Sequence, residues 1–183
     1  MEKRNILFVM SSLRNGGAER SLVNLLQLLD YDRYNVDLLL FQNEGMFLKQ
    51  VPKEVNIISN CNKLYTLYDN NKTEALKHPY LSVVHMIGTF ISRKKTNSVA
   101  KSRQYRWEHF YKKIIPELTK EYDVAIAYMQ REQTYFLVDK VKATKKIAWV
   151  HNEYSQLGHF KEMDLEYFEK VDKVVTISDL KSE

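Results

Sequence analysis

Short apolar runs rich in valine and isoleucine are the feature that most limits how this chain can fold. Each run is flanked by polar residues, and none keeps up the alternation expected of a strand with one solvated face. Such runs are typical of strands buried on both faces, as in a parallel sheet. The six strands that they predict are residues 6–10, 36–41 (interrupted by Asp37), 55–58, 124–128, 147–150 and 174–177.

Helical patterns fall between these runs. Leu22, Leu26 and Leu29 recur at the spacing of one helix face, and residues 132–141 and 164–171 are two further helical candidates. Strands and helices that alternate in this order favour a doubly wound α/β domain with right-handed crossovers. We therefore predict a Rossmann-like parallel sheet of about six to seven strands.

Residues 60–121 do not fit a single strand–helix–strand unit, because they are long, helical in composition and interrupted by Pro79 and Gly88. We interpret them as a mainly helical insertion between the third and fourth strands. The 183 residues suit one domain, and a second full domain would not fit. Residues 178–183 start like a helix, so we expect residues 1–183 to be one domain of a longer protein.

The positive charge is concentrated in one stretch. The whole chain has a net charge of +5, but residues 92–113 hold eight basic residues and one acid, Glu108. That window carries +7 and leaves −2 for the remainder. A basic helix of this kind can lie on an anionic membrane. No nucleic-acid-binding motif accompanies the charge, so we expect no nucleic-acid partner. The membrane-facing candidates are Lys94, Lys95, Arg103 and Arg106.

Two interpretations of this stretch stay open at the level of sequence. Trp107, Phe110, Tyr111 and Ile114 fall on one helical face beside the basic residues. These side chains could face a membrane surface. We favour the other interpretation, in which they pack on the sheet and leave the lysines in solvent, because aromatic helix faces are usually buried.

The sequence contains no segment that would carry it into or across a membrane. No window approaches the roughly 18 apolar residues of a transmembrane helix, and the run 6–10 is too short for a signal peptide. Cys61 is the single cysteine, so no internal disulfide can form and a reducing compartment fits. We expect a cytoplasmic protein, either free or peripheral on the inner face of the membrane.

A glycine pair follows the first predicted strand. Gly16 and Gly17 stand just before the first predicted helix, where free N–H groups and the positive end of the helix dipole favour anionic phosphate. The segment matches neither the dinucleotide fingerprint nor the P-loop motif, which disfavours an NAD-dependent enzyme. A plain loop that turns into a helix explains the pair about as well.

His151 directly follows the fifth predicted strand. Ligands of parallel sheets bind beyond the carboxyl ends of the strands, so its imidazole could contact a substrate hydroxyl or phosphate. The other histidines show no metal-ligand spacing with it. Asp30 and Asp32 have the D-x-D form of some metal-dependent sugar transferases, but their place in a predicted turn disfavours a metal. Arg131 and Ser178 follow strands as well, although helix starts explain both.

Three segments resemble the N-terminal domain of GT-B glycosyltransferases, in particular the retaining group 1 (GT4) family. Residues 6–10 followed by Gly16-Gly17-Ala18-Glu19-Arg20 are similar to the start of that domain. Residues 146–153 are similar to its fifth-strand segment, and residues 174–179 to a segment near its end. The resemblance spans the whole chain in the expected order.

This resemblance implies two Rossmann-like domains with a reactive cleft between them. The N-terminal domain would hold the acceptor, and a C-terminal domain outside this chain would bind the nucleotide-sugar through an E-x7-E motif, which this sequence lacks. His151 would contact the transferred sugar in a catalytic role. No cofactor and no essential metal are expected. The residues implied to bind substrate or donor phosphate are Gly16, Gly17, Arg20, Arg131, Asn152 and Ser178.

The first hypothesis is thus the acceptor-binding half of a retaining glycosyltransferase, inactive alone. It would transfer sugar from a nucleotide-sugar to a glycan or lipid-linked acceptor of surface polysaccharide or glycolipid assembly. The alternative is a free-standing, non-enzymatic Rossmann-like module that binds a phosphorylated ligand or an anionic membrane surface.

Overall fold

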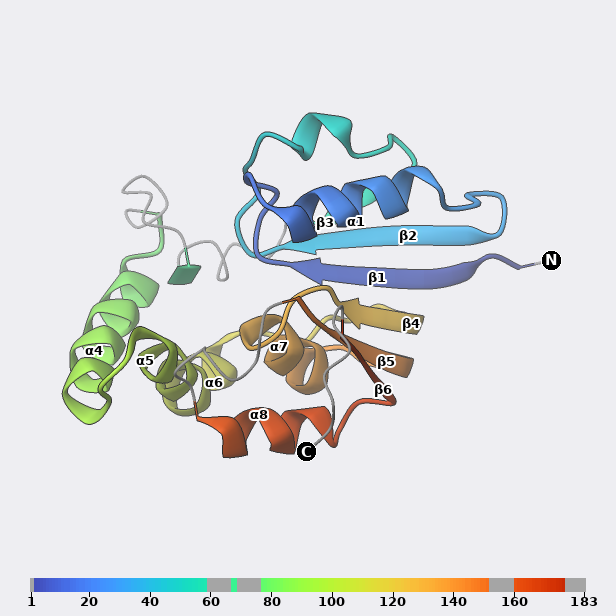
Figure 1. Cartoon of the computed structure of the whole chain (residues 1–183). Helices are drawn as coiled ribbons and strands as arrows, with labels where there is room; N and C mark the ends of the chain where they lie inside the picture. Colours follow the sequence, from blue (N-terminus) through green and yellow to red (C-terminus); the bar gives the residue numbers. More distant parts are fainter. Residues whose placement is uncertain (1, 59–66, 69–76, 152–159, 177–183) are drawn as a thin grey trace.

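The computed structural model describes residues 2–58, 67–68, 77–151 and 160–176, which form an α/β domain around one sheet (Figure 1). The sheet has six strands in the order β3-β2-β1-β4-β5-β6, and every pairing is parallel. This confirms the predicted Rossmann-like parallel sheet. The strands are β1 Arg4–Met10, β2 Tyr34–Leu40, β3 Asn56–Ile58, β4 Glu121–Ala127, β5 Lys142–Val150 and β6 Lys173–Thr176.

The strand β1 shows why the apolar runs lack alternation. Leu7 and Val9 belong to the hydrophobic cluster on one face of the sheet, and Phe8 and Met10 belong to the cluster on the other face. All four side chains are buried. Because helices cover both faces of this central strand, polar residues have no solvated side to occupy.

The connecting helices match the sequence patterns with small shifts. Helix α1 (Gly17–Gln27) buries Leu22 and Leu26 on one face of the sheet, and α7 (Glu132–Lys140) packs on the opposite face. Helix α8 spans Lys161–Phe168 rather than the predicted 164–171. It ends earlier because the N–H of Val171 bonds to the carbonyl of Phe168, which closes a tighter turn.

Helices make up most of the described part of the segment between β3 and β4, as predicted. They are α4 Pro79–Lys95, α5 Val99–Arg106, a π-helical turn Trp107–Tyr111 and the short α6 Lys112–Ile114. Trp107 and Tyr111 are 0% and 1% exposed and belong to the core. The indole N–H of Trp107 donates to Asp139 of α7 over 3.0 Å. Of the two interpretations of the aromatic face, packing against the domain therefore holds for these two side chains.

A buried carboxylate explains why Asp37 interrupts the second apolar run. Its Oδ2 accepts hydrogen bonds from the Tyr122 hydroxyl (2.8 Å) and from Lys120 Nζ (2.9 Å), and its Oδ1 accepts one from Asn56 Nδ2 (2.9 Å). Burial alone would raise the pKa of Asp37, but these hydrogen bonds outweigh it and lower the pKa. The aspartate thus links β2 to β3 and β4.

The sheet topology reverses between β1 and β4. The chain leaves β1 through α1 on one face and leaves β4 through α7 on the other. In sheets of this kind the divergence of the two connections opens a crevice at the carboxyl ends of the strands. Across the described residues, no helix is both long and apolar enough to cross a membrane.

Candidate functional site

A pocket of about 480 Å³ lies at the carboxyl ends of β1, β4 and β5. The N-terminal turn of α1, the loop after β4 and the end of β5 all contribute to its wall. Its position is the one that the topology favours for a ligand. The residues that line it are Gly16, Gly17, Ala18, Glu19, Ser21, Met129, Trp149 and His151.

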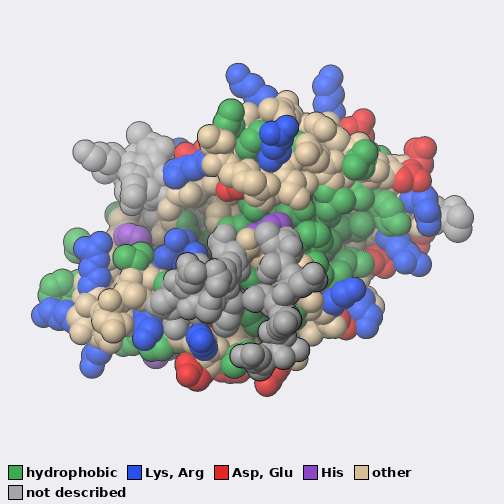
Figure 2. Space-filling view, in the orientation of Figure 1, with side chains coloured by type: hydrophobic (Ala, Val, Ile, Leu, Met, Phe, Trp, Pro, Cys, Tyr) green, Lys and Arg blue, Asp and Glu red, His purple; other side chains and the backbone are tan. Residues whose placement is uncertain are grey.

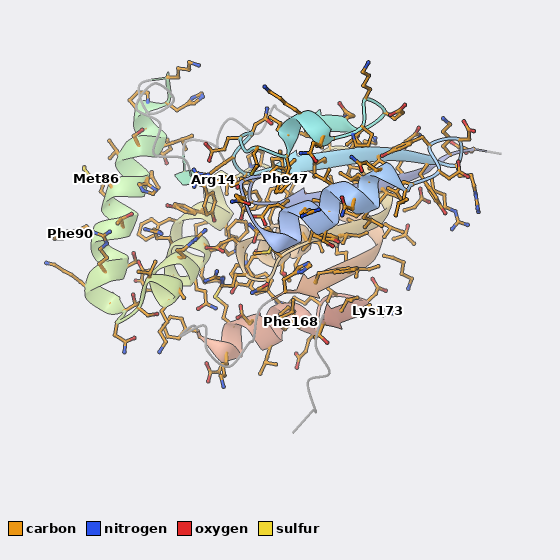
Figure 3. The ribbon with its side chains drawn as sticks, turned by 45° about the horizontal axis from the view of Figure 1, so that its top comes forward. Arg14, Phe47, Met86, Phe90, Phe168 and Lys173 are labelled. Carbon is orange, nitrogen blue, oxygen red and sulfur yellow. The ribbon has the colours of Figure 1, made fainter. Side chains whose placement is uncertain are left out.

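The loop that leads into the glycine pair is fixed by the loop after β2. The N–H of Gln42 donates to the carbonyl of Ser11 (2.7 Å), and the N–H of Phe47 donates to the carbonyl of Leu13 (3.1 Å). Gly45 has φ +128°, and a Cβ there would collide with the Leu13 backbone. Only glycine fits this close approach. Figure 3 labels Phe47 and Arg14 on the two loops, and Arg14 forms an ion pair with Glu44.

The glycine pair leaves the start of α1 only partly open. Gly16 occupies the N-cap position with extended backbone, and no side-chain hydrogen bond caps the helix there. A Cβ added at Gly17 would meet no atom within 4 Å, whereas one added at Gly16 would collide with the Glu19 carboxylate, which would have to move before an anion could bind beside Gly16. Uncapped N–H groups and the helix dipole make such a position favourable for an anion.

His151 lies in an aromatic stack at the other side of the pocket. Its ring centroid is 5.1 Å from that of Tyr128 and 5.6 Å from that of Trp149. Its backbone N–H donates to Gln130 Oε1 over 3.2 Å, which ties the end of β5 to the loop after β4. Among the described residues, its Nε2 is buried and has no hydrogen-bond partner. A buried polar atom of this kind is suited to a ligand contact.

Burial and one carboxylate together set the protonation of this histidine. Desolvation lowers the pKa of His151 below its ordinary value, and the nearby Glu19 carboxylate offsets only part of that effect. The imidazole is therefore neutral at pH 7. A neutral imidazole can accept or donate a proton at Nε2, according to its tautomer.

Arg131 has an unusual backbone in the loop between β4 and α7. Its φ is +70°, a conformation that costs energy for a residue with a side chain, and it occupies the N-cap position of α7. Two nitrogen atoms here are buried without hydrogen-bond partners in the described part of the chain: Nε of Arg131 and the side-chain amide nitrogen, Nε2, of Gln130. Next to them, Gln133 donates to the Ser11 hydroxyl and joins α7 to the loop after β1. Strained backbone and unpartnered polar atoms thus cluster at this edge.

The structure brings together part of the site that the sequence predicted. Gly16, Gly17 and His151 line one pocket, whereas Arg20 is exposed on α1 and Arg131 lies beside the pocket without lining it. Asn152 and Ser178 lie outside the described residues. These placements leave the predicted binding roles as predictions.

Five pocket residues were not among the candidates from the sequence, namely Ala18, Glu19, Ser21, Met129 and Trp149. The Ser21 hydroxyl lies 3.0 Å from that of Tyr128. Spacing could have indicated two of them. Trp149 stands two residues before His151, so both side chains point to the same side at the end of β5, and Glu19 lies in the first turn of α1.

The basic candidates divide into two groups. Lys94 and Lys95 are exposed on α4. Arg103 instead pairs with the buried Glu132 of α7, and Arg106 donates to the Thr89 hydroxyl over 2.8 Å. Both arginines therefore make contacts within the domain, while membrane contact by any of the four stays a prediction.

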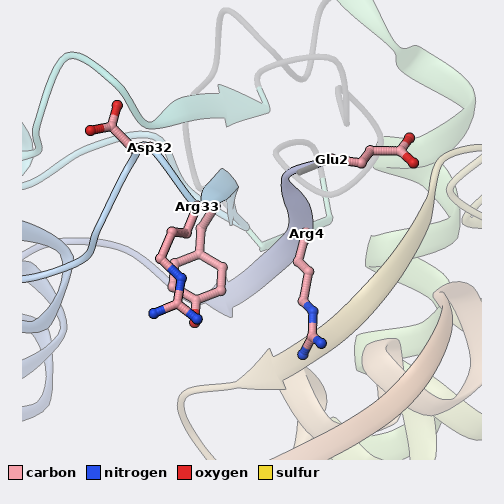
Figure 4. Close-up of a pocket in the computed structure, with 5 residues that line it drawn as sticks. Glu2, Arg4, Asp32 and Arg33 are labelled. Atoms are coloured by element: carbon pink, nitrogen blue, oxygen red, sulfur yellow. The ribbon is translucent and has the colours of Figure 1, made fainter.

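A second pocket lies at the opposite edge of the sheet, near the start of β1 (Figure 4). It has a volume of about 290 Å³, and Glu2, Arg4, Asp32, Arg33 and Tyr34 line it. The amino ends of parallel strands are not where ligands of open α/β sheets bind, which makes this pocket the weaker candidate.

The D-x-D segment forms a turn. The N–H of Asp32 donates to Oδ1 of Asp30 over 3.0 Å, as in an Asx turn. In the parts of the chain that are described, no group of three His, Cys, Asp or Glu side chains is placed to hold a metal ion.

No family model, curated protein or solved structure matches this chain. The fold class of the chain is therefore assigned from the topology of its own sheet. The strand order 3-2-1-4-5-6, with helices on both faces, makes it a Rossmann-like α/β domain with a pocket at the carboxyl ends of its strands.

Proposed function

We propose that this chain is the acceptor-binding N-terminal domain of a retaining GT-B glycosyltransferase. The complete enzyme would transfer sugar from a nucleotide-sugar to a glycan or lipid-linked acceptor in surface polysaccharide or glycolipid assembly. A second Rossmann-like domain would bind most of the donor. The observation that carries the proposal is that Gly16, Gly17 and His151, which are distant in sequence, line a single pocket.

The chemistry of this pocket fits sugar transfer from a diphosphate. With the Glu19 carboxylate turned aside, the N–H groups at the start of α1 can donate to phosphate oxygens in the free space at Gly17, and the unpartnered Nε2 of His151 can contact a sugar hydroxyl. The stacked rings of Tyr128 and Trp149, 4.8 Å apart, hold the imidazole in place. These groups would act by positioning the substrates and by stabilising charge on the leaving diphosphate.

The alternative is a free-standing module that binds a phosphorylated ligand without turnover. The free space at Gly17 supports it, because the N–H groups of a helix start need no catalytic partner to bind an anion. The two functions differ in whether sugar is transferred, so an assay of sugar transfer distinguishes them.

The test compares the 183-residue chain with the longest form that its gene encodes. Both are incubated with a panel of nucleotide-sugars and with lipid-linked and glycan acceptors, and the glycosylated product is measured. The proposal predicts transfer by the longer form and none by the chain alone. Turnover by the chain alone would contradict the two-domain account. Binding of phosphorylated ligands without transfer by either form would favour the alternative.

A further inference from the structure

The helix α4 exposes an apolar stripe along its outer side. Tyr80, Met86 and Phe90 are 66%, 64% and 61% exposed, and Val83 and Ile87 are 47% and 45% exposed. Positions 80, 83, 87 and 90 recur at the spacing of one helix face. Met86 and Phe90 point away from the rest of the molecule in Figure 3. We call these five side chains the outer face of α4.

The inner side of the same helix is already occupied. Leu81, Gly88 and Ser92 are buried, and a Cβ at Gly88 would lie 3.4 Å from the ring of Phe110. The Ser92 hydroxyl lies 2.7 Å from that of Ser102 on α5. The outer face is therefore not the side by which α4 packs on the domain. Leaving five apolar side chains in water is costly, and contiguous patches of this kind mark interaction sites.

Basic side chains lie at the C-terminal end of the outer face. Arg93, Lys94 and Lys95 form the last turn of α4, and Lys94 Nζ lies 4.3 Å from the centre of the Phe90 ring. Figure 2 shows Lys and Arg side chains beside hydrophobic ones at the end of the molecule where α4 lies. Arg93, Lys94 and Lys95 are all exposed, and α4 itself contains no Asp or Glu. The partner of this surface should accordingly be apolar and negatively charged.

We propose that the outer face of α4 docks on an anionic membrane surface. An interfacial helix inserts its apolar side among the acyl chains, while lysine and arginine at its border contact lipid phosphates. The 17 residues of α4 extend about 25 Å, enough to lie along the surface. This inference does not depend on the proposed transferase activity.

A second copy of the chain fits this surface less well. A stable protein interface takes about 20–30 residues from each partner, whereas this face offers five apolar side chains of one helix. The exposed basic side chains in the last turn of α4 have no acidic complement on that helix, so two copies of this face would repel each other there.

Because of where α4 lies, docking through this helix would also fix where the pocket lies relative to the membrane. In Figure 1, α4 and α5 lie on the side of the molecule toward which β1 and β2 run. The pocket at the carboxyl ends of the strands opens at that edge as well. Docking through α4 would therefore hold this edge of the domain near the membrane.

Vesicle flotation of the full 183-residue chain tests the proposal. The vesicles are phosphatidylcholine with phosphatidylglycerol, or phosphatidylcholine alone, at low and at high salt. Met86→Ser with Phe90→Ser removes apolar area, and Lys94→Glu with Lys95→Glu reverses charge. Each pair should weaken binding to the anionic vesicles by about tenfold or more, and high salt should weaken the binding of the wild type.

Two matched pairs provide the controls. Leu28→Ser with Leu165→Ser removes apolar side chains that are 84% and 56% exposed elsewhere. Lys49→Glu with Lys53→Glu reverses two exposed lysines near β3. Both controls should bind within about twofold of the wild type, since they lie away from α4. Circular dichroism checks that every variant is folded.

Three outcomes would overturn the proposal. The first is a wild-type chain that does not bind anionic vesicles at low salt. The second is binding that both α4 pairs leave unchanged. The third is a concentration-dependent dimer in sedimentation experiments that the Met86 and Phe90 substitutions abolish, since the outer face would then be an interface between two copies.

Discussion

The guanidinium Nε of Arg103 lies 2.5 Å from Oε1 of Glu132, whose side chain is 2% exposed. This ion pair joins α5, in the segment between β3 and β4, to the first residue of α7. The Glu132 carboxylate raises the pKa of Arg103 above its ordinary value, and burial opposes that effect. A side chain that the sequence pattern assigned to a membrane surface thus takes part in the domain's own structure.

Arg103→Ala should destabilise the domain by about 3–5 kcal/mol, because it leaves the Glu132 carboxylate buried without a counter-charge. Urea denaturation measures the effect. Lys94→Ala is the control, since an exposed lysine should change the free energy of unfolding by less than about 0.5 kcal/mol. Replacing both partners, with Arg103→Met and Glu132→Leu, should recover part of the loss. An Arg103→Ala variant as stable as the wild type would contradict the assigned role of the pair.

Asp37→Ala should cost about 2–4 kcal/mol at pH 7, because the carboxylate accepts three hydrogen bonds in a buried position. The folded pKa is lowered, so the contribution is present above the unfolded pKa of about 4 and is lost as the pH falls through the folded value. The stability difference from the wild type should therefore be constant from neutral pH down to mild acid and shrink at lower pH. Denaturation at a series of pH values measures it, and a difference that persists at the lowest pH would contradict this account.

Replacement by alanine should affect the stability of the domain very differently at Gly17 and at Gly45. Gly17→Ala should change stability by no more than about 1 kcal/mol, since its Cβ would point into open space. Gly45→Ala should be strongly destabilising, because it combines φ +128° with a collision against Leu13. Thermal denaturation compares the two variants. Similar melting temperatures for both would show that the loop after β2 does not fix the glycine loop as described.

Filling the space at Gly17 should weaken anion binding without unfolding the domain. Gly17→Val places two methyl groups in the open pocket, and we expect the affinity for inorganic pyrophosphate to fall about tenfold. Calorimetric titration measures it, with Leu28→Val as a control on the far end of α1. Unchanged affinity in the Gly17→Val variant would separate the pocket from phosphate binding.

Glu19→Gln should lower the pKa of His151 further, because the carboxylate is the group that raises it. The shift can be followed by NMR titration of the imidazole protons. Glu162→Gln, on the exposed side of α8, should leave the titration of His151 unchanged. A pKa that stays the same or rises on loss of the Glu19 charge would place that carboxylate away from the imidazole.

The sequence carried most of the information about the sheet. The strands β1 and β2 are buried on both faces, and this constraint is visible in consecutive apolar residues. The apolar run of β6 also predicted a strand, but three of its four residues are exposed at the edge of the sheet. The residues against which each helix packs could not be predicted in this way. The pattern around Trp107 shows which side chains share a face, but whether that face meets lipid or protein depends on Glu132 and Asp139 of α7, which a local pattern does not contain.

Only part of the candidate site could be predicted from the sequence. Gly16, Gly17 and His151 follow predicted strands, and the rule that ligands bind at carboxyl ends was enough to select them. The bond between the His151 N–H and Gln130 arises only because β4 and β5 are neighbours in the sheet. Arg131 was selected from its position after β4, but its positive φ has no signal in the sequence.

Sugar transfer by the longest form of the protein, with and without His151→Ala, tests the central claim most directly. The account predicts measurable transfer by the wild type and a fall in kcat of about 100-fold in the variant, the size expected when one preorganised polar contact to the reacting centre is lost. His109→Ala, an exposed histidine, should transfer at the wild-type rate. A folded His151→Ala variant with wild-type transfer, or a wild-type protein that transfers no sugar, would contradict the account.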